Sequence, residues 1–110
     1  MKLRNLLIAS LGLAMAAGAA GAASAATPWQ AQHPRRAEVN HRIERLDHSI
    51  ARERREGRIS GFEAARLRER MHRIHTQEIR YARRGGGHIS RYEQARLNHE
   101  ETGVRRHLAG

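Results

Sequence analysis

The chain has 110 residues, enough for one small domain, and carries 21 Lys and Arg against 11 Asp and Glu, a formal net charge of +10. It contains no Cys, which excludes both a disulfide framework and a thiolate metal site. The stability of a fold of this size must therefore come from helix packing or from a partner.

The first 25 residues have the features of a secretory signal peptide: a basic start, an apolar run of about a dozen residues, and the small residues Ala23-Ser24-Ala25 at the cleavage point. A membrane-spanning helix needs about 20 apolar residues, so an anchor is the less suitable interpretation. We therefore predict a signal peptide over residues 1–25, an extended leader over 26–36 and a helical domain over 37–110, with export to the periplasm.

The leader prediction rests on the stretch TPWQAQHPRR, residues 27–36, which holds both prolines and shows no helical period. Removal of the signal peptide takes away Lys2 and Arg4 and leaves 19 basic residues, all Arg, against 11 acidic ones, a net charge of +8. A genome rich in G and C would favour Arg codons over Lys codons, so the preference for Arg does not by itself indicate a function.

Three segments with helical spacing of apolar residues follow the leader, the first of them over residues 37–56. Their narrow seams are typical of helices that pack against one another: Val39, Ile43, Leu46 and Ile50; then Leu67, Met71, Ile74 and Tyr81; then Leu97, Val104 and Leu108. Glu78 interrupts the second seam and Glu101 interrupts the third. The pattern predicts an all-α fold.

Between the helices lie two copies of one motif, EGRISGFEAARL at residues 56–67 and GGHISRYEQARL at residues 86–97. Glycines in left-handed backbone end the preceding helix, at Gly57 and at residues 85–87. Ser60 and Ser90 then cap the next helix, and Glu63 and Glu93 complete a capping box three residues later. We further expect Ile59 and Ile89 to pack beneath each helix start, and Phe62 and Tyr92 to anchor its first turn.

These segments predict a three-helix, hairpin-type arrangement with capped glycine turns. Few residues of the exported part are large and apolar, so a helical dimer and a partly dynamic monomer are both open alternatives.

The sequence gives little support to calcium binding or to catalysis. Gly57, Ile59 and Glu63 fit the second half of an EF-hand loop, but arginines would then occupy ligand positions at 52 and 54. The serines of the motif are explained as caps, and no carboxylate pair lies in an apolar setting. We predict a protein that is not an enzyme and needs no cofactor.

Metal binding through histidine is the alternative function. All eight histidines lie beyond the signal peptide, and those at helical spacing are His41 with His48 and His72 with His75. Without an HExxH motif, a dense His tract or Cys, solvated histidines on polar helix faces are the simpler interpretation.

Arginines are concentrated on the second helix, whose net charge is about +4. They form a stripe beside the apolar seam: Arg66, Arg70, Arg73, Arg80 and Arg84. Such a surface suits unfolded or acidic envelope proteins, or anionic envelope polymers, although a merely solvated face is equally compatible with it. Export and the lack of aromatic residues interleaved with the arginines argue against nucleic acid, so we expect no nucleic-acid partner.

Two resemblances follow from these motifs. HPRRAEVNHR at residues 33–42 and GGHISRYEQARLNHEE at residues 86–101 resemble small exported proteobacterial proteins with HPRRxEVN and GGHI(S/T)xxExxxLN motifs, which imply no activity. The repeated Ile-Ser-x-x-Glu also resembles the helix-start motif of the Spy/CpxP periplasmic stress proteins. That resemblance implies a small helical, often dimeric protein with chaperone-like or envelope-stress activity that does not use ATP.

Overall fold

The computed structural model describes residues 25–108 and is all-α, as predicted. The predicted signal peptide, apart from Ala25, lies outside the described residues. In the described part of the chain, none of the helices combines the length and apolar character needed to cross a membrane.

The prediction of an extended leader is wrong, because a short helix, α2 (Pro28–Gln32), lies within it. Thr27 begins this helix with a reciprocal cap: its Oγ1 accepts from the Gln30 N–H at 3.1 Å, and its own N–H donates to Gln30 Oε1 at 2.9 Å. A Thr-x-x-Gln capping box with proline at the first helical position is a strong start signal. The next helix then begins at Pro34, inside the predicted leader.

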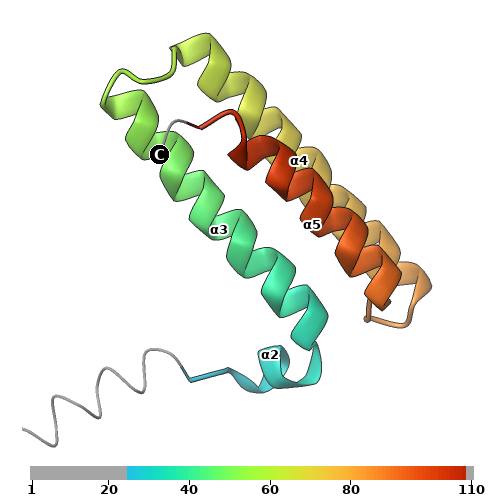
Figure 1. Cartoon of the computed structure of the whole chain (residues 1–110). Coiled ribbons are helices and arrows are strands. Elements are labelled where there is room, and N and C mark those ends of the chain that lie inside the picture. Colours follow the sequence, from blue (N-terminus) through green and yellow to red (C-terminus); the bar gives the residue numbers. More distant parts are fainter. Residues whose placement is uncertain (1–24, 109–110) are drawn as a thin grey trace, which may run out of the picture. The chain divides into compact units, whose positions relative to one another are not determined.

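Three longer helices form a bundle: α3 (Pro34–Arg55), α4 (Gly61–Arg84) and α5 (Arg91–Arg105). Each packs against the other two. Successive helices run antiparallel, so α3 and α5 run in the same direction on either side of the bundle interior (Figure 1). The predicted hairpin with a third helix is confirmed; a dimer stays a prediction.

The core consists of the predicted seams. Most of their apolar residues are buried, while Ile43, Tyr81 and Leu108 are partly exposed and pack at the edge of the core. Ile59 and Ile89, from the turns, are buried at the ends of the bundle, as expected. Burial of a large aliphatic side chain contributes about 1.5–3 kcal/mol, so these seams supply most of the driving force for packing.

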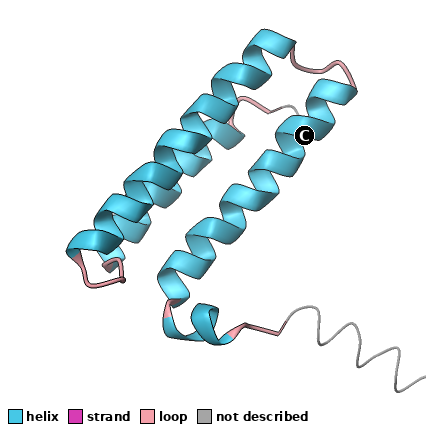
Figure 2. Cartoon of the chain, turned by 180° about the vertical axis from the view of Figure 1, so that it is seen from behind, coloured by secondary structure: helices cyan, strands magenta, loops and turns pink. Residues whose placement is uncertain are grey.

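Two loops join the three helices at opposite ends of the bundle (Figure 2). In the first, Gly57 has φ +76° and the Arg58 N–H donates to the Glu53 carbonyl at 2.9 Å. In the second, Gly86 has φ +65° and the Gly87 N–H donates to the Ala82 carbonyl at 2.7 Å. Both helices therefore end in the same Schellman-type motif, whose left-handed residue is a glycine.

The two loops nevertheless differ by one residue. The left-handed closing position is Gly57 in the first loop and Gly86 in the second, although the sequence repeat pairs Gly57 with Gly87. Gly85 has φ −102°, so the expectation of left-handed backbone is wrong for this residue. It is needed for another reason, since a Cβ there would lie 2.3 Å from the His88 carbonyl oxygen.

Both predicted serine caps are present. Ser90 and Glu93 form the complete capping box, with the Ser90 N–H donating to Glu93 Oε1 at 2.8 Å and the Glu93 N–H donating to Ser90 Oγ at 3.1 Å. Ser60 accepts from the Glu63 N–H at 3.0 Å, but the prediction that Glu63 completes a capping box is wrong, because its carboxylate faces His107 at 3.9 Å instead of the Ser60 N–H. A cap of this kind stabilises a helix by about 1 kcal/mol.

Each of the three long helices buries one glutamate completely: Glu53, Glu78 and Glu101. An arginine approaches each carboxylate. Arg36 donates to Glu78 at 2.5 Å, Arg42 Nε lies 3.6 Å from Glu101, and Arg58 lies 3.9 Å from Glu53. The glutamates that interrupt the seams, Glu78 and Glu101, are therefore buried inside the bundle beside guanidinium groups.

Candidate functional site

The predicted arginine stripe lies along the outer side of α4. Arg66, Arg73, Arg80 and Arg84 are exposed, and Arg70 is half-buried. The Arg70 guanidinium reaches α5, where a Cβ added at Gly103 would lie 2.9 Å from Arg70 Nη2. The stripe therefore borders α5, and the missing side chain at Gly103 leaves the space that Arg70 occupies.

The sequence suggested that the aromatic residues of the repeat anchor the first turns of α4 and α5. This prediction is wrong. Phe62 is 74% exposed and Tyr92 is 72% exposed. The reason is that Ile59 and Ile89 already fill the ends of the core, and the second helical position points away from it. Two large side chains in equivalent positions of the repeat thus lie at the surface.

Each of these aromatics has an arginine one helical turn later. The Arg66 guanidinium lies 5.9 Å from the centre of the Phe62 ring, within the range of a cation–π contact. Arg96 interacts with Tyr92: its guanidinium group donates a hydrogen bond to the Tyr92 hydroxyl, and this bond, followed by the proximity of Tyr81, raises the pKa of Arg96. The repeat therefore provides two aromatic–arginine pairs.

Arg84 extends the second pair, since its guanidinium lies 5.7 Å from the Tyr81 ring centre. Tyr81 and Arg84 belong to α4, whereas Tyr92 and Arg96 belong to α5, so this group crosses between the two helices. We use the term arginine face for the surface formed by both pairs and the stripe: Phe62, Arg66, Arg70, Arg73, Arg80, Arg84, Tyr92 and Arg96.

The acidic groups beside the arginine face balance only part of its charge. Glu69 lies 3.3 Å from Arg73, and Glu100 lies 3.9 Å from Arg96, both one turn apart on the same helix. Pairs of this exposed kind are worth only a few tenths of a kcal/mol, so an acidic partner can replace them.

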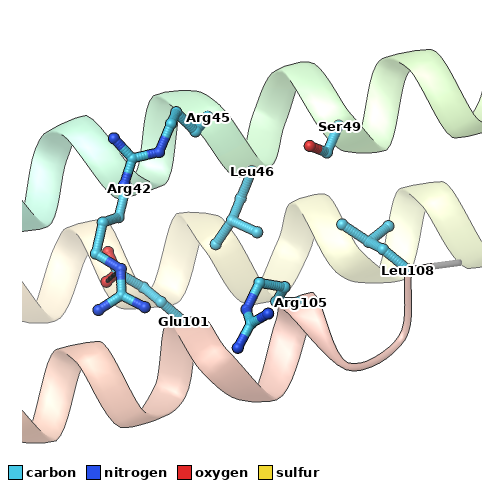
Figure 3. A pocket seen from close by; sticks show the side chains of 7 residues that line it. All are labelled: Arg42, Arg45, Leu46, Ser49, Glu101, Arg105 and Leu108. Atoms are coloured by element: carbon cyan, nitrogen blue, oxygen red, sulfur yellow. Dashed lines mark ion pairs between the residues drawn. The ribbon is translucent and has the colours of Figure 1, made fainter. Parts of the chain in front are cut away.

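A second surface, not predicted from the sequence, is a groove between α3 and α5 with a volume of about 350 Å³. Three guanidinium groups line it, from Arg42, Arg45 and Arg105. Its remaining lining residues are Leu46, Ser49, Glu101 and Leu108. Figure 3 shows Arg42 and Glu101 together at one end of the groove, with Leu108 and Ser49 toward the other.

Glu101 is the unusual group of this groove. Its side chain is completely buried, and neither carboxyl oxygen has a hydrogen-bond partner among the described residues. The contact of 3.6 Å with Arg42 Nε is too long for a hydrogen bond. Burial raises the pKa of Glu101 to about 8, although Arg42 acts in the opposite direction. At neutral pH the carboxyl is therefore mostly protonated and neutral.

The protonated carboxyl changes what the groove can do. A carboxylate would cancel one of the three positive charges, whereas a carboxylic acid leaves all three and adds an O–H donor. The groove therefore presents cations and one donor beside the apolar side chains of Leu46 and Leu108. This chemistry favours an anion with an apolar part.

The histidine alternative receives no support from the geometry. His41, His48, His72 and His75 are exposed, and His75 Nε2 lies 3.8 Å from Glu78. Among residues 25–108, no three His, Cys, Asp or Glu side chains lie close enough to hold a metal ion together. Two other histidines do meet, since the rings of His33 and His88 stack with centres 4.7 Å apart.

Comparisons with protein-family models, with curated proteins and with solved structures give no match. The two arginine-lined surfaces themselves therefore provide the basis for a functional proposal.

Sequence reasoning missed the groove and the exposure of the two aromatics. A signal for the aromatics was present, because Phe62 and Tyr92 lie off the seams that contain Leu67 and Leu97. The groove had no comparable signal, since its residues come from helices far apart in the sequence.

Proposed function

We propose that this chain is a non-enzymatic binding protein of the periplasm that holds acidic, partly apolar segments of unfolded polypeptides on its arginine face. The activity is chaperone-like and needs no nucleotide. The observation that carries the proposal is the exposure of Phe62 and Tyr92, each beside an arginine, on the most basic helix and its neighbour.

Single exposed apolar side chains are common, but here two large aromatics occupy equivalent positions of the repeat, each one turn before an arginine, and neither belongs to the core. The two copies of the repeat place them at the starts of α4 and α5, and these antiparallel helices start at opposite ends of the bundle. A bound segment would meet an aromatic anchor toward each end and a row of guanidinium groups between them. Aromatic and arginine residues are the types that contribute most at protein interfaces.

The arginines select for acidic segments. A guanidinium group forms paired hydrogen bonds with a carboxylate, and its flat face also packs on aromatic side chains. Charge attraction increases the rate of encounter, while apolar contacts with Phe62 and Tyr92 slow dissociation. A simple polyanion would use only the charge attraction and not the apolar contacts, which is why we favour a polypeptide.

The resemblance of Ile59-Ser60 to Glu63 and of Ile89-Ser90 to Glu93 to the helix starts of Spy/CpxP proteins agrees with this proposal. It implies a client-holding function in the same compartment.

The test is suppression of aggregation of an unfolded acidic protein, followed by light scattering at low salt. We expect the purified protein to suppress aggregation at several-fold excess, and R66Q/R80Q to lose most of the effect. Both arginines are exposed, so the fold should be retained. Unchanged aggregation with the unmodified protein would contradict the proposal.

R52Q/R55Q provides the matched control, because it removes the same charge from exposed positions on α3. It should keep most of the activity. Equal losses in both double variants would instead indicate attraction by net charge alone. Binding to anionic vesicles or to a polyanion but not to the acidic client would also overturn the polypeptide proposal.

A further inference from the structure

We propose that the groove between α3 and α5 is a separate binding site for a small carboxylate that bears a short aliphatic chain. Arg45 and Arg105 would hold the carboxylate, Glu101 would donate a hydrogen bond to it, and Leu46 and Leu108 would pack against the chain. This proposal does not depend on the arginine face, which contains none of these residues.

The groove has the size of a ligand site. Its volume of about 350 Å³ falls within the roughly 300–1,000 Å³ typical of small-molecule sites. It also has the mixed lining of such sites, with a few polar groups beside leucine side chains. A ligand of six to eight non-hydrogen atoms is an appropriate probe for the lower part of this range.

The cations of the groove are available for a ligand. Arg45 and Arg105 are exposed at its rim, on α3 and α5 respectively, so their guanidinium groups can turn toward a bound anion. Arg42 is half-buried and lies near Glu38 and Glu101, at 3.9 Å and 3.6 Å. Arg42 therefore positions Glu101, while the other two supply the charge for the ligand.

The unpaired carboxyl group of Glu101 is the observation that indicates a ligand site in this groove. A buried carboxyl group without a hydrogen-bond partner costs free energy, and such groups in folded proteins call for an explanation. A ligand carboxylate in the groove would accept a hydrogen bond from the protonated Glu101. Binding would thereby satisfy a group that the bundle leaves unsatisfied.

Burial, rather than the charged neighbours of Glu101, favours its neutral form. Burial has the largest effect on its pKa, and Glu38 and Glu100 act in the same direction, while Arg42 and Arg45 oppose them. On α4, Arg70 reaches α5 at Gly103 and Glu78 is paired with Arg36. Arg105 faces the same groove. A rise in pH through about 8 would ionise Glu101 and repel the ligand.

The polarity of the groove fixes the orientation of the ligand. The carboxyl group of Glu101 lies at the same end as Arg42, and Leu108 lies toward the other end (Figure 3). The ligand head would lie beside Glu101, and its chain would extend along Leu46 toward Leu108. Acetate, which has almost no chain, should therefore bind more weakly than hexanoate.

The test is titration of the purified protein with hexanoate, followed by calorimetry and by amide chemical shifts of α3 and α5. We expect saturable binding at pH 7 that weakens about tenfold at pH 9, as Glu101 ionises. R45Q/R105Q should weaken binding at least tenfold. E101Q should bind within about threefold of the unmodified protein at pH 7 and show no weakening at pH 9.

Control ligands and variants distinguish binding in the groove from non-specific electrostatic attraction. Hexylamine should not bind. The variant R66Q/R80Q should bind hexanoate as the unmodified protein does, although it no longer suppresses aggregation of the acidic client protein. A short peptide ending in leucine, with a free or an amidated C-terminus, distinguishes a chain end from a free acid as the source of the carboxylate. No saturable binding of hexanoate or of the free-ended peptide, or binding that strengthens from pH 7 to 9, would overturn the proposal.

Discussion

The arginine face and the groove both consist of arginines beside apolar groups, yet they use the guanidinium group differently. On the face, Arg66 and Arg84 stack on aromatic rings at the surface. At the groove, Arg42 reaches inward toward Glu101, whose carboxyl group is buried. The position of an arginine relative to the seam therefore decides whether its guanidinium group is available to a partner or is part of the fold.

Arg36 is the clearest arginine of the inward kind. Its Nε donates to Glu78, and its Nη1 donates to the Gly87 carbonyl at 3.2 Å, so it joins α3 to the end of α4 and the following loop. Removal of one partner leaves the other desolvated and unpaired, which costs far more than the pair itself contributes. The inward arginines should therefore matter most to stability.

Arg36→Ala should change stability most, lowering the free energy of unfolding by about 3–5 kcal/mol. Urea denaturation followed by circular dichroism measures it. The control Arg80→Ala changes an exposed arginine of the face and should alter stability by less than about 0.5 kcal/mol. Replacing both partners, as in R36M/E78L, should restore much of the loss. Similar stabilities for R36A and R80A would remove the distinction between the two kinds of arginine.

The second prediction concerns the pH dependence of stability. Because the pKa of Glu101 is raised to about 8, the folded protein binds more protons than the unfolded chain between pH 4.5 and 8. This contribution is fully present below the unfolded pKa and is lost as pH rises, by about 1.36 kcal/mol per unit. From pH 5.5 to 7.5, ionisation of Glu101 should thus lower the free energy of unfolding by about 2–3 kcal/mol.

The variant E101Q isolates this effect, because it cannot ionise. Its stability relative to the unmodified protein should increase between pH 5.5 and 7.5, as measured by urea denaturation at both values. A constant difference between the two proteins would show that Glu101 does not titrate in this range.

The third prediction tests α5, the helix that both surfaces share. Ser90→Ala removes the acceptor for the Glu93 N–H and should cost about 1 kcal/mol of stability. Threonine at this position should recover most of it. Both binding activities should be retained while the protein is folded, so loss of only one of them in folded S90A would mean that the capped turn contacts that ligand.

The smallest effect on stability is expected for F62A/Y92A. Both side chains are largely exposed, so the free energy of unfolding should change by less than about 0.5 kcal/mol. Suppression of client aggregation should nevertheless fall at least several-fold, while hexanoate binding stays the same. A large loss of stability would show that the aromatics belong to the core, as the sequence first suggested.

Local signals in the sequence predicted most of the fold. The spacing of Leu67, Met71 and Ile74 located the interior of α4, and Ser60 and Ser90 marked the starts of two helices. These signals act over one or two turns, where backbone geometry relates residue spacing directly to position. The helix α2 was missed although its Thr-x-x-Gln box is of the same local kind.

The candidate sites were less predictable, and for different reasons. The arginine stripe of α4 was identified, because a single helix contains it. Its continuation to Arg96 and Tyr92 on α5 depends on how the two helices pack. The groove depends on Arg42 and Arg45 meeting Glu101 and Arg105 across about sixty residues of sequence, a relation that no local period contains.

The helical seams, the capped helix starts and the glycine ends are encoded locally, since each follows from backbone geometry over a few neighbouring residues. Which polar residues are buried depends instead on how the three helices pack. Glu101 looks like Glu100 in the sequence, but packing removes water from one and leaves the other half-exposed. Desolvation, a property of the assembled bundle, makes one of these two carboxyl groups a candidate ligand-binding group.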